Sequence, residues 1–446
     1  MGVQHDHLSV ATPPRVRRIL LATVVPLFVV TAVATALLWP GAAERAPAEN
    51  LTRYGATVQR VVTEACPDAP DTPEGASDGP CGTVTVTVTD GPDAGRQVDA
   101  PIPAGPGAPS VAVGDEVFLV QLTDPEDPSV STYNIADHQR GRPLIWVVGL
   151  FAAAIIAFGR WRGLAALGGL AASFAVLLGF VLPGIQNGRP PLLVAITGAA
   201  LIMFVVLYLT HGITAQTSVA VLGTLASLVL TGLLGTVATA ATHLSGSGSE
   251  ETITLSLMQG DVDLHGLLLA GIIIGSLGVL DDVTVTQAAT VTELARANPD
   301  LSRRQLYRAA TRVGRAHIAS TVNTIVLAYA GASLPLLLLI IASGRGTGDI
   351  LTTEFMGQEI VRSAVATMGL IAAVPITTAL AAVVTTAGHQ HGRPGPRRPP
   401  TDPAEAIAAL SAGSRPAPTD VWATGEPGSA RSQPATPAPR DDPGET

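Results

Sequence analysis

Two adjacent carboxylates interrupt the most apolar part of this 446-residue chain. Asp281 and Asp282 directly follow the segment LLLAGIIIGSLGVL, residues 267–280, which holds nine Leu, Ile and Val residues. Those nine residues would favour insertion into a bilayer by roughly 3–5 kcal/mol, whereas two charged aspartates at its centre would cost about 5–7 kcal/mol. We therefore expect the pair to lie near an interface, to face a polar cavity or to hold a proton. Ionisable residues in such a segment typically mark a functional site.

Further polar residues align with these aspartates if their helix continues toward residue 294. Helical spacing then places on one face Asp282, Thr286, Thr290 and Glu293. Such a stripe would suit a path for a proton or a cation. A helix boundary is the alternative, because the segments 284–287 and 290–293 both have the spacing of a capping box. The residues leave both interpretations open.

A second polar group lies in HIASTVNTIVLAYAGASLP, residues 317–335. Asparagine within a membrane helix usually finds a partner on another helix, so His317 and Asn323 are candidates for the same path. Close packing of the small residues in this segment is the alternative explanation. The candidate substrate or ion path therefore consists of Asp282, Glu293, Asn323, Asp281, Thr286 and His317.

The composition indicates a multispanning membrane protein. Charged residues make up 14% of the chain and hydrophobic residues 47%, whereas a soluble protein has about 25% charged residues. We expect an all-α polytopic bundle, with one helix at 19–39 and seven more within 144–386. The eight apolar stretches are 19–39, 144–159, 163–183, 191–210, 217–243, 264–281, 318–343 and 363–386.

The arginines predict the orientation of these spans. They gather in residues 1–18, at 160–162, in the loop 296–315 and after residue 392. Alternating crossings place all four groups on one side, which the positive-inside rule makes cytoplasmic. The first apolar stretch could instead be a signal peptide, but about 20 apolar residues match a span better than a signal core. We expect the cytoplasmic (plasma) membrane of a bacterium, with the lipid bilayer as partner.

Residues 40–143 predict a small extracytoplasmic β domain. This segment carries 16 acidic residues and six arginines, and CGTVTVTVTDG, residues 81–91, alternates with a period of two. Several short strands between Gly and Pro turns favour a barrel or sandwich of the OB or SH3-like kind. Cys66 and Cys81 flank a loop of this domain. Outside the cell a disulfide between them would stabilise the domain by roughly 3 kcal/mol, and two reduced thiols are the alternative.

The remaining segments suggest no catalytic machinery. Residues 387–446 are rich in Pro, Ala and Ser and predict a disordered cytoplasmic tail. The chain has no Walker-type loop, which argues against a primary pump. It also has no HExxH, no GxSxG and no Cys/His zinc spacing. The basic, aromatic-rich surface that nucleic acid requires is also missing. No metal site is indicated, and cofactors and the oligomeric state are left open.

Three segments carry a family resemblance. GSLGVLDDVTVTQAATVTEL (275–294), STVNTIVLAYAGASLP (320–335) and EIVRSAVATMGLIAAVPITT (359–378) resemble the YibE/F-like family of multipass membrane proteins. The likeness covers roughly 145–386 and extends weakly into the β domain. Its most specific mark is the aspartate of GxLGxxxD with a Glu-Leu downstream, which corresponds to Asp282 and Glu293. In many relatives the residue before that aspartate is not acidic, so Asp281 is a departure. The resemblance implies the fold and a membrane location, but no activity.

These observations favour a permease or an ion-coupled transporter with a polar path around Asp282. A membrane assembly or sensory scaffold, whose β domain binds a cell-envelope partner, is the second hypothesis. A membrane-embedded enzyme is the third and least favoured, because paired carboxylates could support acid–base chemistry or hold Mg²⁺.

Overall fold

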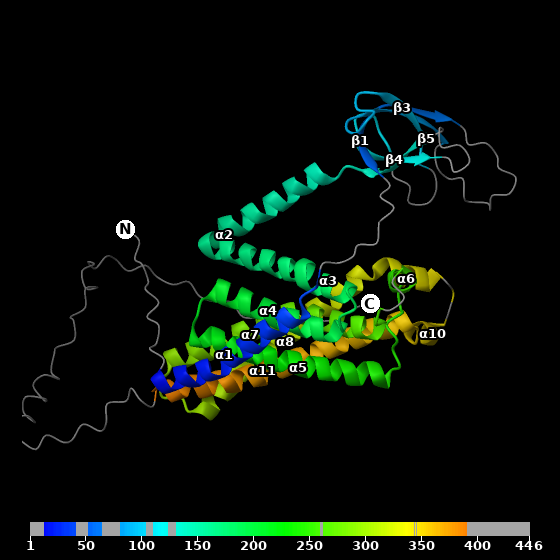
Figure 1. Ribbon diagram of the computed structural model, residues 1–446. Helices are drawn as coiled ribbons and strands as arrows, with labels where there is room; N and C mark the ends of the chain where they lie inside the picture. Colours follow the sequence, from blue (N-terminus) through cyan, green and yellow to red (C-terminus); the bar gives the residue numbers. More distant parts are fainter. Residues whose placement is uncertain are drawn as a thin grey trace, which may run out of the picture. The chain divides into compact units, whose positions relative to one another are not determined.

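The computed structural model comprises a small β-sheet and a larger set of helices (Figure 1). It describes residues 13–41, 52–64, 81–103, 110–123, 131–258, 262–342, 344 and 346–389. Cys66 and nearly all of the expected tail lie outside these residues, so the disulfide and the disordered tail stay predictions.

The sheet has five antiparallel strands in the order β3-β2-β1-β4-β5. Their bounds are Arg53–Glu64 (β1), Cys81–Val88 (β2), Gln97–Pro101 (β3), Glu116–Thr123 (β4) and Ser131–His138 (β5). The alternation expected of β2 is present, because Val84, Val86 and Val88 are all buried. The two outer strands, β3 and β5, also contact each other, which curls the sheet around this core.

A buried tyrosine ties the last strand to a turn. The Tyr133 hydroxyl donates a hydrogen bond to the carboxylate of Asp93, which lies between β2 and β3. This bond holds the pKa of Asp93 below its usual value, with Arg96 contributing in the same direction. It also raises the pKa of Tyr133 to about 12. The turn and β5 are therefore linked by a bond that depends on the ionised carboxylate.

Six helices among the described residues are long and apolar enough to cross a membrane. The full set of helical elements, spanning or not, is α1 (Pro14–Leu38), α2 (Gly141–Val176), the π-helical turn η1 (Leu177–Val181), α3 (Leu182–Gln186), α4 (Pro191–His211), α5 (Ala215–Ala241), α6 (Glu250–Met258), α7 (Leu264–Ala297), α8 (Arg303–Ala332), α9 (Leu334–Ala342), α10 (Thr347–Leu351) and α11 (Glu354–His389). The six candidate spans are α1, the continuous run α2–η1–α3, α4, α5, α7 and α11.

Two of the eight expected apolar stretches share one helical run. Gly141–Gln186 is 46 residues long and contains both 144–159 and 163–183. Its backbone leaves the helical conformation at Arg160, where φ is 51° and ψ is −128°, and the ribbon of α2 bends sharply (Figure 1). The stretch expected at 318–343 is divided between α8 and α9. Neither helix is among the six candidate spans: α8 begins with an arginine-rich segment, and α9 has only nine residues. The expected count of eight spans stays a prediction.

Helix α7 continues well beyond the expected end at residue 281. It begins with Asp263, whose side chain caps the helix by accepting from the N–H of Gly266, and it runs to Ala297. The interpretation of 284–293 as a helix boundary is therefore wrong. Thr284 does not cap a new helix, because its hydroxyl donates to the carbonyl of Asp281 in the preceding turn and is shared with Thr224 on α5.

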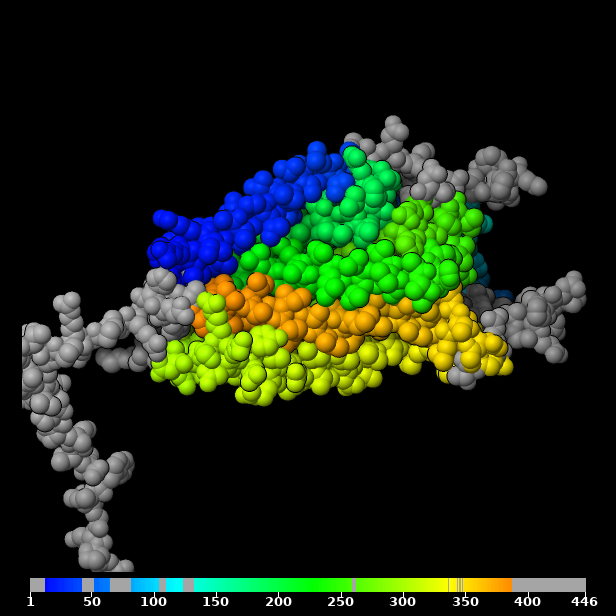
Figure 2. Space-filling model, turned by 90° about the horizontal axis from the view of Figure 1, so that it is seen from below, coloured from blue at the N-terminus to red at the C-terminus, as the bar shows by residue number. Residues whose placement is uncertain are grey.

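Helices α5, α7 and α11 form the centre of the bundle and pack through small residues. A Cβ at Gly223 on α5 would collide with Thr377 on α11, and one at Gly369 on α11 would collide with Thr231 on α5. These reciprocal pairs establish that α5 and α11 run antiparallel. Figure 2 shows α1, α5, α11 and α8 side by side on one face of this bundle. Close backbone approach at small residues is typical of membrane helices.

One end of the bundle gathers the arginine-rich segments. The Nε of Arg303, at the start of α8, donates to Thr386 near the end of α11 at 2.8 Å. Tyr208 and Ser218 join the end of α4 to the start of α5 at 3.2 Å. Gly169, shortly after Arg160 and Arg162, packs against Val206 and Thr210 near the end of α4. Bends and loops that carry arginine thus lie at the same end of the packed helices.

Candidate functional site

Asp281 and Asp282 lie inside α7 and face different neighbours. Adjacent helical residues are separated by about 100° around the axis. Asp282 faces α8, where its Oδ2 lies 3.8 Å from Nε2 of His317. Asp281 lies on the other side and lines a cavity with residues of α2, η1 and α4. The two carboxylates therefore belong to two different surroundings.

The Asp282–His317 pair can carry a proton. At 3.8 Å the two groups are too far apart for a direct hydrogen bond, so they form an ion pair only when the imidazole is protonated. The side chain of Asp282 is 70% exposed and that of His317 is 40% exposed. The His317 Nε2 itself is buried, with no hydrogen-bond partner among the described residues. A carboxylate beside an imidazole is a combination that proton relays of membrane transporters use.

Asp281 is half-buried, and its Oδ1 is buried without a hydrogen-bond partner among the described residues. It lines a half-enclosed cavity of about 190 Å³, whose other lining residues are apolar apart from Ser173. The Ser173 hydroxyl already donates to the carbonyl of Gly169 at 3.0 Å. Asp281 is thus the only ionisable group lining this cavity among the residues described.

The other predicted residues are not gathered around Asp282. Thr286 and Glu293 are exposed on the same face of α7, as the helical spacing requires. Glu293 pairs instead with Arg296 at 2.6 Å, and it lies 11 residues from Asp282, about 16 Å along the helix. Asn323 is exposed on α8. The structure therefore brings together Asp282 and His317, and it places Asn323 and Glu293 apart from them.

A buried polar junction between α7, α8 and α11 was missed in the sequence. Gln287 is 3% exposed, and its amide nitrogen donates to the Ala310 carbonyl at 2.9 Å and to the Thr378 hydroxyl at 2.7 Å. The sequence did hold a signal, because Gln287 lies four residues from both Val283 and Val291 and so shares an apolar helix face with them. The capping-box interpretation of residues 284–287 gives Gln287 a different and purely local role. Its bonds fix the packing of three helices beside the aspartates.

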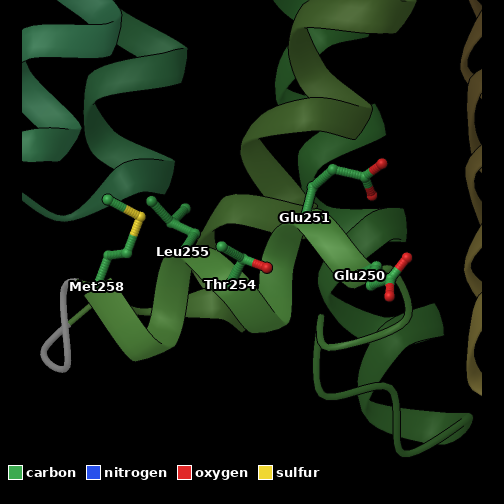
Figure 3. A pocket seen from close by; sticks show the side chains of 5 residues that line it. All are labelled: Glu250, Glu251, Thr254, Leu255 and Met258. Carbon is green, nitrogen blue, oxygen red and sulfur yellow. The ribbon is translucent and has the colours of Figure 1, made fainter. Parts of the chain in front are cut away.

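Neither a metal site nor the hollow beside α6 offers a second candidate site among the described residues. The described residues contain no group of three or more His, Cys, Asp or Glu side chains that could hold a metal ion. The exposed helix α6 borders an open hollow lined by Glu250, Glu251, Thr254, Leu255 and Met258 (Figure 3). All five residues come from this one helix, so the hollow has no opposing wall from another element.

Comparison with known families matches residues 147–387 to the YibE/F-like protein family. The match spans more than half of the 446 residues. The chain belongs to the YibE/F-like family. The family segment begins inside α2 and ends within α11, so it includes both aspartates, His317 and the buried junction. No match emerged among curated proteins or among solved structures. With several apolar helices, this YibE/F-like protein is a multipass membrane protein.

Proposed function

We propose that this YibE/F-like protein is a proton-coupled permease whose proton site is the Asp282–His317 pair. The observation that carries the proposal is the position of this pair. Asp282 lies in the candidate span α7, where a charge is costly, and His317 lies on the antiparallel helix α8, with the two side chains 3.8 Å apart. Carboxylate and histidine chains are the usual groups of proton relays in transporters.

The end of α7 and the start of α8 suggest on which side of the membrane a path from this pair would open. Glu293 and the arginines at the start of α8 lie toward the arginine-rich end of the bundle. By the positive-inside rule we place that end in the cytoplasm and the β-sheet domain outside, in the cytoplasmic membrane of a bacterium. The exposed face that bears Asp282, Thr286 and Glu293 would then lead from the pair toward the cytoplasm.

The β-sheet domain supplies the extracytoplasmic part of this proposal. Its order β3-β2-β1-β4-β5, with β3 and β5 in contact, supports a five-stranded barrel of the OB kind. The scaffold hypothesis, with an envelope partner at this domain, has no contact or surface in its favour that compares with the Asp282–His317 pair.

Proton movement through reconstituted protein tests the proposal. Liposomes that contain the purified protein and a trapped pH-sensitive dye are given a potassium diffusion potential with valinomycin. We expect faster internal acidification than in liposomes without protein, and we expect Asp282→Asn to reduce the excess rate at least tenfold. Asp281→Asn is the matched control, because it removes the adjacent charge and leaves the pair with His317 in place. It should have the smaller effect.

Two results would contradict the proposal. One is acidification by the wild type at the rate of empty liposomes. The other is an Asp282→Asn protein that moves protons as fast as the wild type. Gel filtration and helical circular dichroism show whether each variant is folded, and asparagine preserves the size of the aspartate side chain.

A further inference from the structure

The cavity at Asp281 has the chemistry of a binding site for a compact organic cation. Its lining residues come from four elements of the bundle, namely α2, η1, α4 and α7. Leu177 opens the π-helical turn η1, and such turns occur frequently at functional sites. The cavity is therefore bordered by an irregular helix on one side and by a carboxylate on the other.

The absence of a side chain at Gly278 keeps this cavity open. Gly278 lies one turn before Asp281 and also lines the cavity. A Cβ at this position would meet no atom within 4 Å. A larger side chain there has room to extend into the cavity that Gly278 lines, because its Cβ collides with no neighbouring helix. This gives a means to close the site without touching Asp281.

The lining of the cavity limits what kind of cation it can take. A metal ion such as Mg²⁺ or Ca²⁺ needs about six or more oxygen ligands. Asp281 and Ser173 are the only oxygen-bearing side chains among the lining residues. The other lining residues, such as Met203 and Val206, are apolar. A charged head at the carboxylate and an apolar body against these walls would satisfy both parts of the lining.

The volume sets the size of that apolar body. An apolar cavity of about 150 Å³ is large enough for benzene, and this one measures about 190 Å³. We propose that the cavity between α2, η1, α4 and α7 binds a small organic ammonium ion, with its cationic head at Asp281 and its apolar body beside Gly278. Binding of this ion does not depend on the proposed permease function. Only the idea that the ion is a transported substrate rests on that function.

Benzylammonium, a benzene ring with one charged methylene-ammonium group, is the probe for this site. Binding to the full-length protein in detergent is measured by isothermal titration calorimetry. We expect Asp281→Asn to weaken binding at least tenfold, because the charge partner is lost. Asp282→Asn should change the affinity less than threefold, since that carboxylate faces α8. Gly278→Leu should abolish binding by filling the cavity.

Benzyl alcohol is the neutral control for the same experiment. It should bind the wild type and Asp281→Asn with similar affinity, and Gly278→Leu should exclude it. No binding of benzylammonium to the wild type at millimolar concentration would overturn the proposal. Equal affinity in the wild type and Asp281→Asn, or a loss in Asp282→Asn as large as in Asp281→Asn, would overturn it as well.

The two proposals fail separately. Lost binding with intact, Asp282-dependent proton movement would remove the ammonium site and leave the permease. Binding that depends on Asp281, in a protein that moves no protons, would support the cavity and remove the proton-coupled function. If Asp281→Asn or Gly278→Leu unfolds, the other variant still decides the outcome, because each removes a different part of the site.

Discussion

Gly314 allows α8 to approach the buried amide of Gln287, so replacing it with alanine should destabilise the bundle. A Cβ at Gly314 would lie 2.7 Å from Oε1 of Gln287 and 2.7 Å from Cγ1 of Val374. Ordinary van der Waals contacts begin at 3.4 Å. Both neighbours would therefore have to retreat by more than half an ångström.

Neither neighbour can retreat freely. Gln287 is held by its hydrogen bonds to the Ala310 carbonyl and the Thr378 hydroxyl, and Val374 is buried on α11. Overpacking a well-packed interior costs about 1–3 kcal/mol. Hydrogen bonds between membrane helices contribute about 0.6 kcal/mol each, and two are at risk. Relative to a glycine-to-alanine change on the same helix without a clash, we expect Gly314→Ala to lower the free energy of unfolding by roughly 2–4 kcal/mol.

Unfolding in detergent with increasing sodium dodecyl sulfate, followed by helical circular dichroism, measures this change. Gly331→Ala is the matched control on the same helix, because a Cβ there meets no atom within 4 Å. Alanine favours helix by up to about 1 kcal/mol over glycine, so the control should be neutral or slightly stabilising. Equal stability of the two variants would refute the reasoning.

A double variant tests whether Gln287 is the obstacle. In a Gln287→Ala background the amide is gone, so Gly314→Ala should cost less than in the wild type. The difference should be at least about 0.5 kcal/mol, as for residues in contact. If the losses in unfolding free energy from Gly314→Ala and Gln287→Ala are strictly additive, Gln287 is not the residue with which the new Cβ collides.

Three further predictions concern the β-sheet domain and the topology. Because the Asp93 pKa is lowered by the Tyr133 hydrogen bond, the stabilisation is present near neutral pH and lost as pH falls through the Asp93 titration. Tyr133→Phe should then lower the thermal midpoint of the domain at about pH 7 and much less at about pH 3; equal losses at both would contradict this. Thiol labelling of the unreduced, unfolded protein should find no free cysteine if Cys66 and Cys81 are joined. A reporter fused after the sheet domain should read extracytoplasmic and one fused at the start of α8 cytoplasmic, and the reverse at either place would break the topology.

The sequence was sufficient to predict which strands and helices form, but not where each of them ends. Val84, Val86 and Val88 alternate in the chain and are buried in the sheet, because a pleated strand turns every second residue to the same face. The residues alone did not predict where α7 ends. Thr284 and Gln287 have the spacing of a capping box, but partners on α5, α8 and α11 provide their hydrogen bonds instead. Those partners are remote in the sequence, so local pattern could not select them.

The candidate site also combines residues that the sequence could indicate with an arrangement that only the packing of remote helices provides. Residue type alone marks Asp282 and His317 as candidates in separate apolar segments, and only the antiparallel packing of α7 and α8 brings them within 3.8 Å. The cavity at Asp281 has no local signature. It depends on α2, η1 and α4, all of which precede α7 by many residues, and on the direction in which Asp281 leaves the helix.

The adjacency of the two aspartates predicts that cation binding and protonation are coupled. A cation at Asp281 lies next to the residue Asp282, whose carboxylate is 3.8 Å from His317. It therefore favours an ionised Asp282 and disfavours a protonated His317. Coupling between binding sites is reciprocal, so benzylammonium binding should release protons to the buffer. Calorimetry in buffers with different ionisation enthalpies measures this release, which should shrink in His317→Gln while the affinity site at Asp281 remains. Release of the same number of protons by the wild type and His317→Gln would separate the cavity from the proton pair, and the two carboxylates would then act independently.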